Sequence, residues 1–209
     1  PSVSAETDFE RIRALQMEMR HSTVTSQHTF LTQTAQGMIN YISDIGGDTT
    51  ELESLKKEYD DLLSELTATD RHIDLNDLLH DKSRPLMKSF REEYRSQFDD
   101  NDGTPLLALA TIGKELEAGK DKREELEDTA WNTREENTIA IYNIHMENYR
   151  NYLDWFEAHD YDTTELEEKF DELIDKREEL RTAISDRKLL VMAQVYSDIA
   201  DIRRDIVFI

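Results

Sequence analysis

The chain has 209 residues, of which 37% are hydrophobic and 34% are charged, and its formal net charge is −22. This negative charge argues against binding to nucleic acid or to an anionic membrane surface, because phosphate groups are bound by clustered Lys and Arg. We instead expect cationic partners, divalent cations or a surrounding medium of high salt. The absence of Cys excludes disulfides, thiolate metal sites and thiol nucleophiles. No stretch approaches the roughly 20 apolar residues of a membrane span, so no direct membrane insertion is expected.

Long helices are the expected secondary structure, since the chain has only six Gly and three Pro. The first helix is expected from about residue 5 to 45, a stretch without Pro that ends at the Gly46-Gly47 pair. Its middle, residues 20–29, is rich in Ser, Thr, Gln and His, which predicts a kink or a less buried stretch. Apolar residues recur along this helix at helical spacing, and they include Phe9, Ile12, Leu15, Met19, Phe30, Met38, Tyr41, Ile42 and Ile45.

One phrase occurs twice: DTTELE at residues 48–53 returns at residues 162–167. A comparable helical pattern follows each copy, which indicates two related halves, placed here at residues 1–99 and 100–209. In each copy a Thr and a Glu fit the S/T-x-x-E capping box that opens a helix; the pairs are Thr50 with Glu53 and Thr164 with Glu167.

Both copies open helices with an apolar seam that is typical of helix–helix packing. After the first copy the seam is Leu52, Leu55, Tyr59, Leu62 and Leu66. After the second copy it is Leu166, Phe170, Leu173 and Leu180, with Arg177 interrupting it. A further helix is expected from about residue 75 to 98, kinked at Pro85, with its counterpart at residues 189–208.

The turn DDNDGTP at residues 99–105 is the predicted domain boundary, because Thr104 can cap a helix and Pro105 suits its first position. The helix that begins there is expected to run to about residue 159, with a local irregularity at Gly119. Roughly 55 residues at about 1.5 Å each give a length of ~80 Å, which cannot fit a compact globule. The sequence therefore predicts an all-α, elongated fold of tandem three-helix bundle or coiled-coil units, joined by the long helix from about 105 to 159.

Two groups of residues are candidates for a metal site. Glu18 and His21 match E-x-x-H, the spacing that places a carboxylate and an imidazole on one helix face in di-iron or di-manganese bundles. Asp100 and Asp102 lie in a turn that resembles a calcium loop, although Phe98 and Leu109 occupy the positions of its two essential acidic ends. Chance spacing in a Glu-rich helix and an Asp-rich solvated turn are the alternative explanations.

Six aromatic residues gather near the end of the long helix and in the turn after it: Tyr142, Tyr149, Tyr152, Trp155, Phe156 and Tyr161. Their helical spacing favours core packing, with a stacking surface for a sugar or a partner as the alternative. There is no G-x-S-x-G elbow and no phosphate-binding Gly loop. We therefore expect no catalytic residues and no cofactor, in a protein that is not an enzyme.

The segment YLDWFEAHDYDTTELE at residues 152–167 is followed by FDEL at residues 170–173. It resembles a module of exported or cell-envelope archaeal helical-bundle repeat proteins of uncharacterised activity. In that module one helix ends, a Gly or polar turn follows, and an acidic helix begins. Residues 45–53 resemble the same module, and Asp160 stands where a Gly would be expected. The resemblance implies a cell-surface location and no established activity.

One leading hypothesis and two alternatives follow. The leading hypothesis is a non-enzymatic structural or interaction protein of the cell envelope, extracellular in location. It would act as a helical scaffold or assembly subunit that binds a protein partner or a second copy through apolar helix seams. The alternatives are a periplasmic-type chaperone or cation-binding helical module, and a carboxylate-bridged metalloenzyme that would use Glu18 and His21. Because the chain begins at Pro1 and ends in an apolar run up to Ile209, we also expect the natural chain to be longer.

Overall fold

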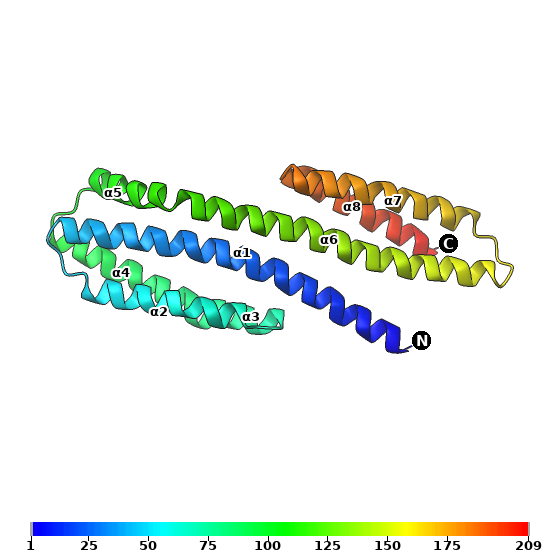
Figure 1. The fold of residues 1–209 in the computed structure, drawn as a ribbon, viewed down its shortest axis with the longest axis horizontal. Coiled ribbons are helices and arrows are strands. Elements are labelled where there is room, and N and C mark those ends of the chain that lie inside the picture. Colours follow the sequence, from blue (N-terminus) through cyan, green and yellow to red (C-terminus); the bar gives the residue numbers. More distant parts are fainter. Residues whose placement is uncertain (1, 209) are drawn as a thin grey trace. The chain divides into compact units, whose positions relative to one another are not determined.

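The structure is a computed structural model that describes residues 2–208, and every regular element among them is a helix (Figure 1). The all-α prediction is therefore confirmed. Pro1 and Ile209, on which the expectation of a longer chain depends, lie outside the described residues. A π-helical turn over Leu79–Ser83 lies directly before the predicted kink at Pro85. The α-helices are α1 (Ser2–Asp44), α2 (Thr50–Thr67), α3 (His72–Leu78), α4 (Arg84–Asp100), α5 (Pro105–Ala118), α6 (Lys120–Glu157), α7 (Thr164–Ser185) and α8 (Leu189–Phe208).

The chain forms two compact units, which differ from the predicted halves at residues 1–99 and 100–209. Unit 1 combines residues 2–19 with residues 131–208, and unit 2 is residues 20–130. Unit 1 therefore contains segments of four helices, α1, α6, α7 and α8, rather than the predicted three. The reason is that the start of α1 packs on α6 rather than on the helices that follow it in sequence. Within unit 1, for example, the buried Asn137 side chain donates to the carbonyl of Leu15 at 3.0 Å.

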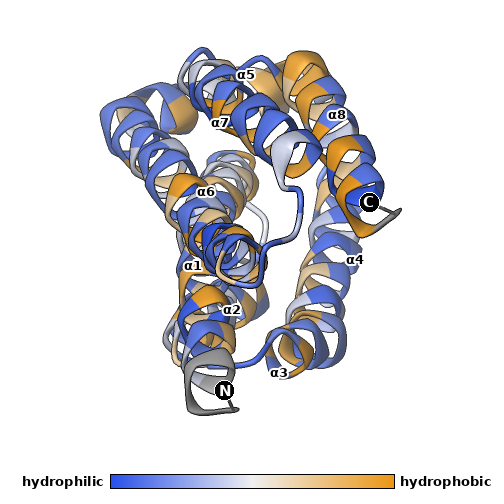
Figure 2. Cartoon of the chain, turned by 90° about the vertical axis from the view of Figure 1, so that its right-hand side faces the viewer, coloured by the Kyte–Doolittle hydropathy of each residue, from blue (hydrophilic) through white to orange (hydrophobic). Residues whose placement is uncertain are grey.

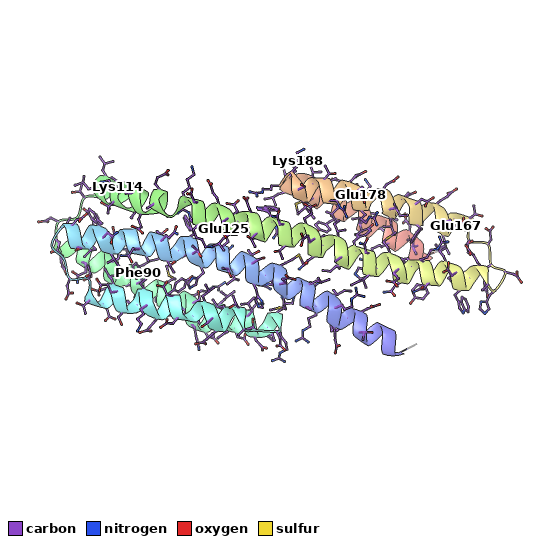
Figure 3. The ribbon with its side chains drawn as sticks, viewed as in Figure 1. Phe90, Lys114, Glu125, Glu167, Glu178 and Lys188 are labelled. Carbon is purple, nitrogen blue, oxygen red and sulfur yellow. The ribbon has the colours of Figure 1, made fainter. Side chains whose placement is uncertain are left out.

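The core of unit 2 lies between α1, α2 and α4. Ile42 of α1, Leu52 of α2 and Phe90 of α4 are almost fully buried, and Phe90 is labelled on α4 in Figure 3. The predicted seam of α2 is confirmed, because four of its residues are buried: Leu52, Tyr59, Leu62 and Leu66.

The polar middle of α1 is mostly half-buried, and His28 is its one buried side chain. His28 is only 5% exposed, its Nε2 lies 2.7 Å from the carbonyl oxygen of Tyr59, and its ring stacks on the Tyr59 ring at 4.4 Å. Helix α1 continues through this stretch without a break. Phe9 and Phe30, two of the apolar residues at helical spacing in α1, are exposed.

The core of unit 1 is formed mainly by α7 and α8, which run side by side next to the later part of α6 (Figure 1). Hydrophobic and hydrophilic residues alternate around these helices (Figure 2). At the predicted interruption of the α7 seam, Arg177 Nη1 donates to Asn143 Oδ1 of α6 at 3.1 Å. The buried side chains are Leu173, Leu180, Ala183 and Ile184 of α7, Met192, Val195, Ile199 and Ile202 of α8, and Met146 of α6.

The two copies of DTTELE form the same helix start. In the first, Asp48 Oδ1 accepts a hydrogen bond from the Thr50 N–H at 2.9 Å, and the Thr49 hydroxyl donates to Glu53 Oε1 at 2.8 Å. The second copy repeats both contacts, between Asp162 and the Thr164 N–H at 3.1 Å and between Thr163 and Glu167 at 3.2 Å. The predicted capping boxes at Thr50 and Thr164 are wrong, because an Asp two residues earlier caps the N–H of that Thr.

Four helices end with the same backbone motif, in which an N–H bonds to the carbonyl five residues earlier. The pairs are Gly47 with Ile42, Gly103 with Phe98, Tyr161 with Phe156, and Lys188 with Ala183. This Schellman arrangement places the preceding residue in the left-handed region. Those residues, with their φ values, are Gly46 (83°), Asp102 (52°), Asp160 (61°) and Arg187 (55°). Asp160 thus adopts the conformation that the expected Gly would have had.

The predicted helix from about 105 to 159 is two helices, α5 and α6, which meet at Gly119. A Cβ at Gly119 would lie 2.3 Å from the side-chain nitrogen of Gln33. Arg123 bonds to that same Gln33 side chain and to the carbonyl of Leu116. Gly at this position therefore allows Gln33 to sit against the backbone where the helix is interrupted.

Candidate functional site

Unit 1 contains two cavities that share Tyr149 as a wall. The inner cavity, of about 260 Å³, lies among residues of α1, α6, α7 and α8. The outer cavity, of about 420 Å³, lies where α6 turns into α7, beside Ile206 and Val207 of α8. Both are lined mostly by apolar and aromatic groups with a few polar ones, which is the usual composition of a small-molecule site. They are the candidate functional site of the described residues.

Aromatic rings form most of the outer cavity. Tyr152 and Tyr161 are 65% and 59% exposed, whereas Leu153 beside them is buried. Phe156 and Tyr161 meet edge to face, with ring centres 5.5 Å apart. The full lining comprises the aromatic residues Tyr149, Tyr152, Phe156, Tyr161 and Phe170, the aliphatic residues Leu153, Leu166, Ile206 and Val207, and Asp162.

Neighbouring aromatic side chains order this end of α6. The Trp155 ring stacks on the imidazole of His159 at 4.1 Å and lies nearly parallel to the Tyr161 ring at 6.2 Å. His159 Nδ1 is 2.7 Å from the carbonyl of Trp155, which orients the imidazole. Such contacts hold exposed rings in place at little further entropic cost when a ligand binds.

Asp162, which lies in the lining of the outer cavity, belongs to an acidic stretch of the chain. The N–H and hydroxyl of Thr164 hold the pKa of Asp162 below its usual value, so this carboxylate is charged at neutral pH. The last turn of α6 contains no basic residue to balance the negative end of the helix dipole. Between residues 151 and 168 there is no Lys or Arg, and the seven carboxylates are Asp154, Glu157, Asp160, Asp162, Glu165, Glu167 and Glu168.

The inner cavity has a different electrostatic character. Burial raises the pKa of Tyr142 to about 12, and the Tyr142 hydroxyl donates to the Leu173 carbonyl at 2.7 Å. Burial and the nearby charge of Arg203 lower the pKa of His145, against the opposing effect of Asp8. Arg203 Nε donates to the Tyr149 hydroxyl at 3.0 Å. At neutral pH the wall thus carries the neutral imidazole of His145 and the neutral phenol of Tyr142 beside the guanidinium of Arg203.

The predicted aromatic group divides between core and surface. Tyr142 and Tyr149 pack against the core of unit 1, as expected. Tyr152, Trp155 and Tyr161 are exposed, so core packing is wrong for them. Helical spacing places residues on one face of a helix but does not indicate where the neighbouring helix ends, and this is why the error falls at the end of α6.

The candidate metal ligands do not form a larger cluster. Glu18 Oε2 accepts a hydrogen bond from Asn137 at 2.9 Å, whereas His21 Nε2 lies 3.2 Å from the Thr69 hydroxyl. Asp100 is the last residue of α4, and Asp102 is the left-handed residue of the turn after it. Among the described residues no three His, Asp or Glu side chains are grouped as metal ligands would be.

Two exposed apolar stretches were not predicted from the sequence, and each lies at the start of a helix. In α8, Leu189, Leu190 and Val191 are 61%, 89% and 47% exposed. In α5, Leu106, Leu107 and Leu109 are also exposed. The sequence could have indicated this exposure. Adjacent residues of a helix point to different sides, so a run of apolar residues cannot all face one core.

No family model, no curated protein and no solved structure matches the chain. Within residues 2–208, no helix is both long enough and apolar enough to cross a membrane.

Proposed function

We propose that this protein is a non-enzymatic interaction protein that associates with a second copy of itself through the start of α8. The observation that supports the proposal is the exposure of Leu189, Leu190 and Val191, three adjacent large apolar side chains in the first turn of a helix. Apolar groups clustered on a surface gain free energy when a partner removes them from water, at about 25 cal/mol per Å².

The same side of α8 continues the apolar surface. Tyr196 is 46% exposed and lies seven residues, or two helical turns, after Leu189, so the two side chains share one side of the helix. Met192, Val195 and Ile199 are buried against the core of unit 1, and helical spacing places Leu190 on the opposite side of α8. A second copy is the favoured partner because one self-complementary patch is enough to form a two-fold symmetric dimer.

An elongated scaffold of tandem helical units in the cell envelope is part of this proposal. The identical caps formed by the two DTTELE copies support a relationship between the two parts of the chain. The extracellular location is supported by the resemblance of residues 152–173 to exported archaeal modules. A function as a scaffold requires no catalytic residues.

Light scattering coupled to size-exclusion chromatography, over a hundredfold range of concentration, tests the proposal. We expect the wild type to form dimers and Leu190→Glu to remain monomeric, because a buried carboxylate opposes association. Leu107→Glu in α5 is the matched control, since it places the same charge on another exposed leucine and should leave the dimer intact. A monomeric wild type at high concentration, or a dimer lost only with Leu107→Glu, would contradict the proposal.

A further inference from the structure

We propose that the outer cavity of unit 1 binds a small free quaternary ammonium cation such as choline. This inference is independent of self-association through α8. It depends on three properties of the cavity: the rings that line it, the charges around it, and its partial exposure.

Aromatic rings form much of the lining of the outer cavity. Five aromatic side chains line a cavity of about 420 Å³, and the exposed rings of Tyr152 and Tyr161 are accessible from solvent. The electron-rich faces of such rings attract cations, and quaternary ammonium groups are typically bound by several rings together. The methyl groups of the cation would also contact Leu153 and Leu166, which are apolar parts of the lining.

One ring of the cavity already contacts a cation. The Arg150 guanidinium lies 5.9 Å from the centre of the Phe170 ring, while its Nε is 3.2 Å from Asp154 Oδ1. Arg150 is not part of the cavity lining. The arrangement indicates that Phe170 is placed where a positive charge is tolerated beside an aromatic face.

The acidic residues near the outer cavity favour a positively charged ligand. Asp162 lies in the lining, and residues 151–168 contain seven carboxylates without a Lys or Arg. The basic residues that flank this stretch, Arg150 and Lys169, are paired with Asp154 and Glu172. The Glu167 carboxylate, at the start of α7, is labelled in Figure 3. A positive ligand is attracted by this field, and an anionic or zwitterionic ligand with a carboxylate is disfavoured. Arg203, which donates to the hydroxyl of the shared Tyr149, is part of the lining of the inner cavity and not of the outer one.

Isothermal titration calorimetry with tetramethylammonium and choline is the direct test, with 3,3-dimethylbutanol as the neutral isostere of choline. We expect both cations to bind the wild type and the alcohol to bind at least fivefold more weakly. Tyr161→Leu, which removes one ring but keeps an apolar side chain, should raise the Kd about fivefold. Circular dichroism confirms that the variant has kept its helices.

Asp162→Asn tests the charge with a matched control elsewhere in the chain. Asn retains the acceptor that caps α7, so the loss of charge should raise the Kd about threefold without unfolding the helix start. Asp48→Asn removes the same charge from the same cap on α2, and Asp48 does not line the cavity. The Kd of Asp48→Asn should equal that of the wild type.

Three results would overturn the proposal. The first is no cation binding at tens of millimolar, and the second is equal binding of choline and its neutral isostere. The third is sedimentation of the protein with phosphatidylcholine vesicles but no binding of the free cation, which would assign the cavity to a lipid head group. Loss of dimerisation in Leu190→Glu with choline binding unchanged would leave this inference intact, because the two sites are separate.

Discussion

Single residues in the left-handed region determine how several helices of this protein end. Gly46, Asp102, Asp160 and Arg187 occupy equivalent positions at the ends of α1, α4, α6 and α7. Only Gly adopts this conformation without a steric cost from its side chain, and an L-residue with a Cβ pays about 1 kcal/mol or more. Three of the four ends therefore carry backbone strain that the rest of the fold must offset.

Asp102→Gly should stabilise the protein by about 1 kcal/mol, because it removes the Cβ from a left-handed residue whose side chain is exposed. Gly46→Ala, at the equivalent position after α1, should destabilise it by a similar amount. Urea unfolding followed by circular dichroism measures both changes. If the two substitutions shift the midpoint in the same direction, the strain at these helix ends does not limit stability.

Because of Tyr142, the free energy of unfolding of unit 1 should decrease at alkaline pH. Its pKa is raised to about 12 by burial, so its neutral form is favoured in the folded protein. That stabilisation is complete below the usual pKa of about 10 and is lost as the pH rises towards and through 12. The difference in unfolding midpoint between wild type and Tyr142→Phe should therefore shrink from pH 9 to pH 12. A difference that is constant over this range would contradict the assignment.

The two copies of DTTELE stabilise the starts of α2 and α7. Asp48 and Asp162 each cap the helix that follows, and the Thr50 and Thr164 N–H groups lower the pKa of the two carboxylates. Because the folded pKa is depressed, the stabilisation is present above the usual value near 3.8 and is lost as the pH falls through the folded pKa.

Asp162→Ala should speed hydrogen exchange of the amides in the first turn of α7, and Asp48→Ala should do the same in α2, because each variant loses the carboxylate that accepts from the first N–H of the helix. Asn at either position should keep exchange slow. Mass spectrometry of peptides covering the two helix starts measures the rates. Equal exchange in the Ala and Asn variants would show that the carboxylates do not cap these helices.

The elements also show how far sequence patterns determine this fold. The seams of α2 and α7 were predicted correctly because regular apolar spacing requires a neighbouring helix. The pattern could not identify that neighbour, so the division of α1 and α6 between two units was missed. For the same reason Tyr152 and Tyr161 were assigned to the core. The carboxylates around them were visible in the sequence, but their grouping with the rings depends on the turn after α6.

At the scale of the whole molecule, a strongly acidic surface coexists with exposed apolar patches. A net charge of −22 keeps copies of the chain apart through repulsion, which salt screens over about 10 Å at 0.1 M. Association through α8 must overcome this repulsion. It should therefore strengthen as the salt concentration rises, whereas binding of a quaternary ammonium cation should weaken under the same conditions.

Cross-linking through a single introduced Cys tests self-association through α8 most directly, because the native chain contains none. Under mild oxidation, Leu190→Cys should form a disulfide-linked dimer rapidly, since the same residue of two copies meets across a two-fold interface. Glu178→Cys, on the exposed surface of α7 and labelled in Figure 3, should stay monomeric under the same conditions. Equal cross-linking rates at the two positions, or none at Leu190→Cys, would contradict the account.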